Sequence, residues 1–404
     1  MTSAEPTAEQ PAALRQARTA LLVSFLLQGA TFALLVTRIP GLQRQYALTD
    51  GTLTVILAAV PILAGVGSLC SEQLVRRTSP RAVLRTVQPL LILTLVTGGL
   101  GHRLWALVPV LAAFGLLTGA LDASMNMLAV ALQHRYGRSI MLGFYAAYSL
   151  GGIIGALLAS AGARLHLLTL FGACAVVLIP AALLAGRSFA GPRELGSAVQ
   201  EAAAAAARAI PWKPLLPLCA VLAFAYIADA TVSNWSAKDL TESLHSSDRV
   251  AALAYAGYLT TLLIGRTVGD RWVQRFGATA VVRAGAGVAA LGLLIAALAP
   301  TPWLGIAGFT VLGVGNCAVI PQVFAAGGRL FPDDLDAAVA RLNLFNYVGF
   351  LVGAPLVGAI AGASSYHWAL LAPMLLVLAV VPLAGHFAAP AKRPLALDHA
   401  SSRA

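Results

Sequence analysis

The sequence predicts an all-α polytopic membrane protein with twelve transmembrane helices in two pseudo-symmetric six-helix halves. Three observations lead to this fold class. Of the 404 residues, 59% are hydrophobic and 11% are charged, too few charges to give a soluble domain a polar surface. The apolar residues form twelve windows of about 20 residues, the length that crosses a bilayer. The basic residues gather between alternate windows, as expected for a protein oriented by its positive charges.

The twelve windows fall into two sets around one long charged connection. The first set lies at 19–37, 51–71, 83–101, 105–132, 139–163 and 166–186. The second set lies at 214–236, 250–270, 279–299, 303–328, 339–362 and 366–388. The implied organisation is an N-terminal tail at 1–18, halves at 19–186 and 214–388, a linker at 187–213 and a C-terminal tail at 389–404. The alanine run of the linker predicts either a short surface helix or a flexible tether.

The positions of Lys and Arg predict the orientation. Twenty of the 27 basic residues fall in the tails and in the connections on the same side, six fall on the other side, and Arg266 lies within a span. Because basic residues mark the cytoplasmic side, we expect a multi-pass protein of the cytoplasmic (inner) membrane with both termini in the cytoplasm. The net charge of +11 is then explained by orientation, and we expect no nucleic-acid partner.

The two halves repeat one another. A shift of 198 residues, without a gap, places Gly115 on Gly313 and Gly151 on Gly349. The same shift pairs Gly67 with Gly265, Gly155 with Gly353, Glu72 with Asp270 and Arg77 with Arg275. Agreement at one shift across three pairs of spans indicates an internal repeat. Repeats of this kind build transporters that bind substrate between the halves, near the bilayer midplane.

Acidic residues within two spans indicate a functional site, because a charge in hydrocarbon is costly unless it faces protein or water. Asp122 has no basic residue closer in sequence than Arg103 and Arg135, and Asp229 lies within the seventh span. We expect Asp122 to face an aqueous cavity and to take up a proton, with Asp229 as the second candidate. Polar side chains at helical spacing predict the cavity lining. These are Gln28, Thr31, Thr118, Asn126, Tyr145, Tyr148, Tyr226, Ser233, Asn343, Asn346 and Tyr347. For any single one, an interhelical hydrogen bond is the alternative role.

Several motifs resemble the major facilitator superfamily. "GRTVGDRWVQRFG" at 265–277 and its partner "GSLCSEQLVRRTS" at 67–79 place an acid at a helix end with Arg after it. "TRIPGL", "GALDASMN", "YSLGGIIG" and "NWSA" are similar to the fucose-permease-like branch. The chain departs from that branch at Asn234, where an acid is common, and at Ser71, where the loop motif has Gly. The resemblance implies the major facilitator fold, with a cavity lined by spans one, four, seven and ten.

The resemblance also implies a gate. Glu72 and Asp270, with Arg77 and Arg275 as basic partners, would latch the cytoplasmic side, and a solvated loop is the alternative for these motifs. Arg38 ends the first span on the outer side. From its reach along the helix, we expect it to pair with Asp229 across the outer gate.

Together these features predict a secondary active transporter that moves a small organic solute by alternating access, coupled to protons. The excess of Arg over Lys is typical of high-GC bacterial genomes, whose carriers of this kind often export metabolites, so efflux of a metabolite or drug is favoured. Proton-coupled uptake of a sugar or related polar solute is the alternative, and a membrane sensor or receptor with a transporter fold is another. A nucleotide-binding loop and a His or Cys cluster are both missing from the sequence, so we expect neither an enzyme nor a cofactor or metal. The expected partners are a small-molecule substrate, the proton and the lipid bilayer, and the expected state is a monomer.

Overall fold

The computed structural model describes residues 12–136, 140–191, 195, 204, 208–331 and 334–387, and nearly all of them are helical. The first half contains α1 (Ala12–Val36), α2 (Ile39–Tyr46), α3 (Asp50–Arg77), α4 (Pro80–Leu100), α5 (Leu104–Tyr136), α6 (Met141–Ala161) and α7 (Leu167–Arg187). The second half contains α10 (Leu216–Glu242), α11 (Asp248–Phe276), α12 (Ala278–Ala297), α13 (Pro302–Leu330) and α14 (Leu335–Ala363). It closes with the short segments α15 (Tyr366–Ala369), α16 (Leu371–Leu378), α17 (Val380–Leu383) and η2 (Ala384–Phe387). The all-α prediction is confirmed.

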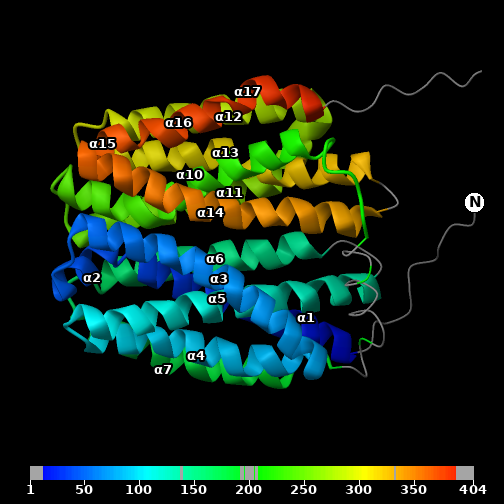
Figure 1. Cartoon of the computed structure of the whole chain (residues 1–404), viewed down its shortest axis with the longest axis horizontal. Helices are drawn as coiled ribbons and strands as arrows, with labels where there is room; N and C mark the ends of the chain where they lie inside the picture. The colour runs from blue at the N-terminus through cyan, green and yellow to red at the C-terminus, as the bar shows by residue number, and fades with distance from the viewer. Residues whose placement is uncertain are drawn as a thin grey trace, which may run out of the picture.

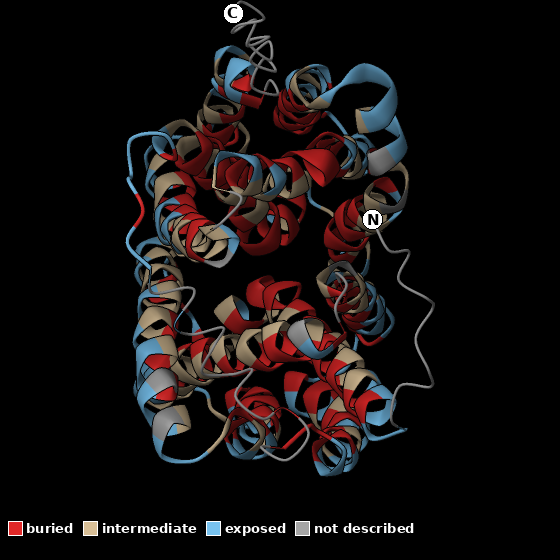
Figure 2. Ribbon diagram, turned by 90° about the vertical axis from the view of Figure 1, so that its right-hand side faces the viewer, coloured by how far each residue is buried: buried red, intermediate tan, exposed pale blue. Residues whose placement is uncertain are grey.

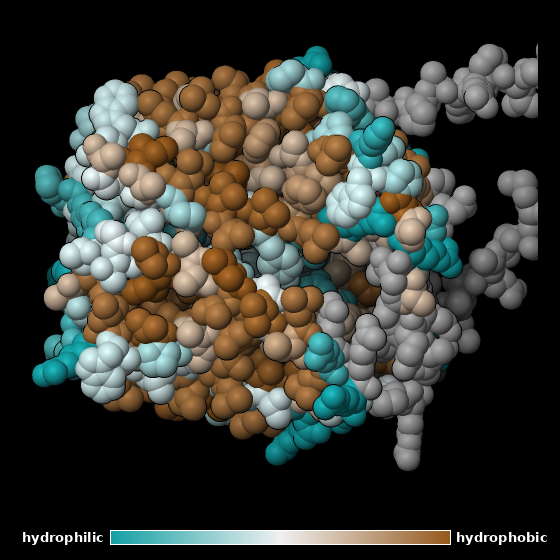
Figure 3. All heavy atoms as spheres, viewed as in Figure 1, coloured by the Kyte–Doolittle hydropathy of each residue, from teal (hydrophilic) through white to brown (hydrophobic). Residues whose placement is uncertain are grey.

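The helices form one bundle whose sides are apolar. Within the described residues, eleven helices are long and apolar enough to cross a membrane, counting 366–387 as one. α11 is 29 residues long and lies in the same bundle, but Arg266 and its neighbouring polar residues make it less apolar. Brown apolar side chains cover the middle of the molecule and teal polar ones lie toward its two ends (Figure 3). The chain is therefore a multi-pass membrane protein whose helices correspond to the predicted spans.

Three local features differ from the expectation. α1 begins at Ala12, within the predicted tail, where the polar first turns extend a helix whose apolar part begins later. α2 is a helix that hydropathy does not detect, because it has only eight residues and the polar Gln43, Arg44 and Gln45 offset its apolar side chains. The last span is broken into short helical pieces. Apart from Ala204, the alanine run of the linker lies outside the described residues, as do the residues of both tails outside 12–387.

Helix ends coincide with capping side chains. The Thr49 hydroxyl accepts a hydrogen bond from the Thr52 amide at the start of α3, at 3.2 Å. Ser79 does the same for Ala82 at the start of α4, and Ser247 for Val250 at the start of α11. Such caps satisfy amide groups that the first helical turn leaves unpaired. The starts of α3 and α11 lie at the same end of the bundle, where side chains of α2 contact both Asp50 and Asp248.

The two halves pack in the same pattern. In Figure 1 the first half lies below and the second half above. Equivalent helices pair within each half: α1 with α6 as α10 with α14, and α3 with α5 as α11 with α13. Between the halves, α6 packs on α11 and α3 packs on α14. Figure 2, a view along the helices, shows buried residues concentrated toward the middle of each half. The internal repeat read from the sequence thus corresponds to two equivalent helix packings.

The repeated glycines lie where helices cross closely. A Cβ atom on Gly115 would lie 2.8 Å from the Val60 carbonyl oxygen, and one on Gly313 would lie 2.6 Å from the Tyr258 carbonyl oxygen. Val60 and Tyr258 are themselves 198 positions apart. Small residues at such crossings let membrane helices approach closely. Glycine is therefore required here by the backbone of the facing helix.

Gly119→Val is expected to destabilise the first half. A Cβ atom at this position would collide with the backbone of Ala64 on α3, which cannot move aside as a side chain could. We expect a loss of folding stability of at least about 1–3 kcal/mol, the usual cost of overpacking. Thermal unfolding in detergent checks this, with Gly172→Val as the control because nothing lies within 4 Å of a Cβ atom there. Equal unfolding temperatures for the two variants would contradict the prediction.

Candidate functional site: a central cavity and a closed far end

A cavity of about 240 Å³ lies at the junction of the two halves. Its lining comes from α1, α2, α3, α5 and α6 of the first half and α10, α11 and α14 of the second. Eleven of the thirteen residues predicted for proton coupling and substrate binding belong to this lining. They are Gln28, Thr118, Asp122, Asn126, Tyr145, Tyr148, Tyr226, Asp229, Asn343, Asn346 and Tyr347. We call this polar part of the cavity the chamber.

Asp122 is held in the chamber by amide groups. The Gln28 side-chain amide on α1 donates a short hydrogen bond to the Asp122 carboxylate on α5. One turn along α5, the Asn126 side chain donates to the Asp122 carbonyl at 2.9 Å and accepts from the Tyr145 hydroxyl at 3.1 Å. Among the described residues, the Asp122 carboxylate is in no ion pair. Its charge is thus compensated only by a neutral donor.

Two further polar atoms around Asp122 lack a partner. Gln28 is only 4% exposed, and its Oε1 atom accepts no hydrogen bond from any described residue. The Thr118 residue, one turn before Asp122 on α5, is partly exposed, but its hydroxyl oxygen is buried and has no hydrogen-bond partner in the described part of the chain. A buried polar group without a hydrogen bond is costly. Both residues line the chamber, so the two oxygens lie close to any molecule bound there.

Asp229 lies on α10 in a different electrostatic setting. The Tyr258 hydroxyl donates a hydrogen bond to its carboxylate, and Arg266 on α11 interacts with it electrostatically. Arg266 also donates to the Ser149 hydroxyl of α6 at 3.0 Å, so it connects the two halves beside the chamber. The sequence places Arg266 inside a span, but no sequence pattern predicted a role for it. A lone basic residue in a span carries the same signal as a lone acid.

The remaining lining candidates, Thr31 and Ser233, lie outside the cavity lining. The Thr31 hydroxyl donates to the Leu27 carbonyl at 2.7 Å, and the Ser233 hydroxyl donates to the Ala230 carbonyl at 3.2 Å. Both are bonds to the preceding turn of their own helix, a common arrangement for hydroxyls in helices. Asn234, which departs from the branch motif, does line the cavity, and its side-chain amide donates to the Ala230 carbonyl.

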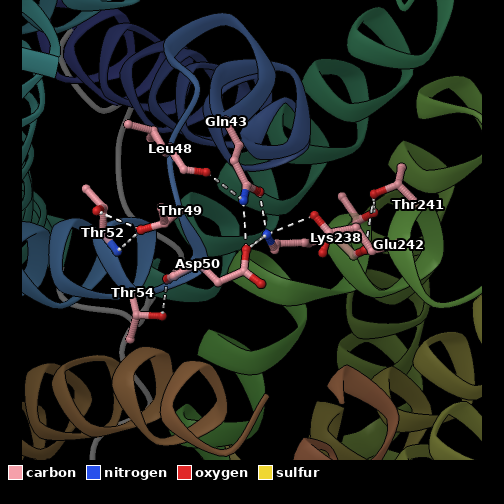
Figure 4. Close-up of polar contacts among 10 residues, drawn as sticks. Gln43, Leu48, Thr49, Asp50, Thr52, Thr54, Lys238, Thr241 and Glu242 are labelled. Carbon is pink, nitrogen blue, oxygen red and sulfur yellow. Dashed lines mark hydrogen bonds and ion pairs between the residues drawn. The ribbon is translucent and has the colours of Figure 1, made fainter. Parts of the chain in front are cut away.

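The end of the bundle away from the N-terminus, the far end, is closed by charged groups that join the halves. Lys238 of α10 is fully buried, and its ammonium group donates to the Asp50 carboxylate at 2.6 Å (Figure 4). It also donates to the Gln43 side chain of α2 and pairs with Glu242 at 2.9 Å. Gln43 in turn donates to Asp50 at 2.7 Å. We call this group the Lys238 cluster.

Arg38 takes part in a second far-end cluster. Its guanidinium lies 3.1 Å from the Asp248 carboxylate at the start of α11, and Arg44 of α2 pairs with the same carboxylate. Burial lowers the pKa of Arg38, and the neighbouring Asp248 raises it. The predicted pairing of Arg38 with Asp229 is wrong, because Asp229 lies in the middle of α10 beside Tyr258 and Arg266. Arg38 nevertheless joins the two halves at the far end, and its role in a gate stays a prediction.

A double-mutant cycle should find coupling between Arg38 and Asp248. Arg38 is 4% exposed, so removing Asp248 leaves a guanidinium with poor hydration, whereas removing Arg38 leaves Asp248 with Arg44 as its partner. We expect the summed free-energy costs of the two single alanine variants to exceed the cost of the double variant. The difference, the coupling energy, should be about 1–3 kcal/mol when measured by thermal unfolding or by transport. The same cycle between Arg38 and Asp229 should be additive. Coupling of Arg38 to Asp229 and not to Asp248 would contradict this expectation and support the pairing predicted from the sequence.

The gate residues predicted at the opposite end are only partly described. The side chains of Glu72 and Asp270 lie outside the described part of the structure. Arg77 ends α3 and is exposed, and Arg275 lies in the last turn of α11 with its guanidinium 5.3 Å from the centre of the Phe276 ring. The latch role of these four residues therefore stays a prediction.

Comparison with known proteins agrees with this architecture. The family model described as Major Facilitator Superfamily matches residues 218–402. An MFS-type transporter of Yersinia pestis is 29% identical over 376 residues, covering 92% of this chain and 96% of the relative. A bacterial homologue of the human lysosomal transporter Spinster, in an inward-facing and occupied conformation, superposes with a TM-score of 0.71 at 13% identity, covering 94% of this chain and 97% of that one. A D-xylose-proton symporter superposes with a TM-score of 0.68 at 16% identity, covering 93% and 99%. The chain therefore has the major facilitator fold, and residues 218–402 match the model of that superfamily.

Proposed function

We propose that this chain is a proton-coupled secondary transporter that moves a small organic solute across the cytoplasmic membrane by alternating access, with efflux favoured over uptake. The observation that carries the proposal is the Asp122 carboxylate, which lies in a cavity at the junction of the halves and forms no ion pair with any described residue. The described side chains of the whole cavity lining include two carboxylates and one guanidinium, and Arg266 interacts with Asp229. One negative charge is left at Asp122.

A buried negative charge without a counterion is unfavourable in a membrane. Either a proton or a cationic solute can neutralise Asp122, and the two would compete for it. Competition of this kind couples the release of one to the binding of the other, which is the requirement for exchange of a solute against protons. This reasoning favours efflux driven by proton entry. The closed far end would then have to open once in each cycle.

Uptake of a polar solute such as a sugar is the second candidate. Its support is the set of amide side chains in the chamber, which can both donate and accept hydrogen bonds. They are Gln28, Asn126, Asn343 and Asn346. A polyol would use these groups without needing a charge at Asp122.

Reconstitution separates these candidates. The purified chain in proteoliposomes is screened against cationic, neutral and anionic solutes under an imposed pH gradient of either direction. Efflux coupling predicts accumulation only when protons leave the compartment that gains solute, and symport predicts the reverse. Binding without flux in either gradient would indicate a receptor and would overturn the proposal.

A further inference from the structure

The cavity has a second, apolar part that lies almost wholly within the first half. From the chamber it continues toward the far end between α1 and α3, with α5 forming the third wall. Side chains that define it include Leu35 of α1, Ile56 and Val60 of α3, and Leu107, Leu111 and Phe114 of α5. We call this part the apolar arm.

The apolar arm is continuous with the site of Asp122. Leu107, Leu111, Phe114, Thr118 and Asp122 follow one another at intervals of three or four residues, so one face of α5 lines both parts. From Leu107 to Thr118 this face is roughly 16 Å long, at about 1.5 Å per residue. Leu107 and Phe114 are no more than 2% exposed. The far-end clusters close the molecule beyond it.

The two parts of the cavity favour different chemical groups in one bound molecule. The arm offers only hydrocarbon and aromatic surface, which favours an apolar chain. The chamber offers a carboxylate and two unpaired buried acceptors, Gln28 Oε1 and the Thr118 hydroxyl oxygen. A protonated amine supplies both the positive charge and several N–H donors for these oxygens. Neither a sugar nor an organic anion suits both parts.

We propose that the transported solute is an elongated amphipathic amine in its protonated form. Its ammonium group binds Asp122, Gln28 and Thr118 in the chamber, and its alkyl chain lies in the apolar arm along Val60 and Leu111. This inference rests on the proposed transport function, because it takes the bound amine to be the transported solute. Its test measures binding and not transport. A transporter that fails to use protons could still bind such an amine, and a proton-coupled transporter could reject it.

The test measures binding of methylammonium, octylammonium and octyl sulfate to the full chain in lipid nanodiscs, with empty nanodiscs to subtract partition into lipid. Each buried methylene favours binding about fourfold, so octylammonium should bind at least about a hundredfold more tightly than methylammonium. Octyl sulfate should bind at least about tenfold more weakly than octylammonium, because it places a second negative charge beside Asp122.

A blocked arm provides the decisive variant. Leu111→Trp fills the arm without touching the chamber, so the advantage of octylammonium should fall to within about tenfold of methylammonium while methylammonium binds as before. Val108→Trp is the matched control, because Val108 lies on the same helix with 48% exposure toward the outside. Val60→Trp, on the facing wall of the arm, repeats the test if Leu111→Trp does not fold.

Three results would overturn the proposal. Equal binding of octylammonium and methylammonium to the wild type would show that the alkyl chain is not recognised. A chain-length advantage that survives in both arm variants would place the alkyl group elsewhere. Octyl sulfate binding as tight as that of octylammonium would show that the site does not select a cation.

Discussion

Asp122→Asn is expected to abolish gradient-driven accumulation completely while leaving part of the solute exchange. Asparagine has nearly the same shape as aspartate but cannot gain or lose a proton, so the cycle loses its means of coupling. The Gln28 amide can rotate to meet the new side chain, and Asn126 and Tyr145 keep their bonds. Folding should therefore survive. Uphill accumulation and counterflow in proteoliposomes, measured on the same preparation, check the two parts of this expectation.

Asp229→Asn is the control for this result. Its carboxylate is bonded to Tyr258 and faces Arg266, so its neutralisation should disturb solute recognition or the closing of the halves more than coupling. If Asp122→Asn transports uphill at the wild-type rate and with the same pH dependence, Asp122 is a structural residue. Asp229 would then be the better candidate for proton coupling.

The double variant Asp50→Asn with Glu242→Gln is expected to open the far end. It leaves the fully buried Lys238 ammonium without an anionic partner. An unpaired buried charge costs about 3–5 kcal/mol, which would shift the balance between closed and open far ends by about 10²–10³. A cysteine at Leu111, in a chain whose four native cysteines are replaced, should then react correspondingly faster with an impermeant maleimide added on the far side.

Adding Lys238→Met to this double variant provides the matched control. The triple variant removes the unpaired charge as well as its partners, so the far end should close again and labelling should slow. If the triple variant labels as fast as the double variant, the apolar and hydrogen-bonded contacts around the cluster hold the far end closed. The charge itself would then have no such role.

Much of the fold follows from local physics that a sequence displays. Each apolar window is long enough to span a bilayer, and a helix is the structure that satisfies its backbone there, so helix number and type could be predicted. The spacing of Thr118, Asp122 and Asn126 places them on one face of any helix, independent of its neighbours. The structure places all three at the same cavity.

The ion pairs between residues of the two halves could not be predicted in the same way. Arg38 finds Asp248, 210 residues away, because the end of α1 and the start of α11 meet at the far end. That meeting depends on how two complete halves pack, which no local pattern records. Hydropathy did not predict α2, because its eight residues carry too few apolar side chains. The contacts of Gln43 and Arg44, which lie on α2, were therefore not predicted either. The apolar arm was missed because Leu and Val in a membrane helix look the same whether they face lipid or a cavity.

The two far-end clusters have opposite polarity. In the Lys238 cluster the first half supplies the acid Asp50 and the second half supplies the base, whereas at Asp248 the first half supplies the bases Arg38 and Arg44. If the halves met in a shifted register that exchanged these partners, Asp50 would face Asp248 and Lys238 would face Arg38. Like charges brought together in this way repel by several kcal/mol. The two clusters therefore favour the observed register of the halves over one in which the partners are exchanged.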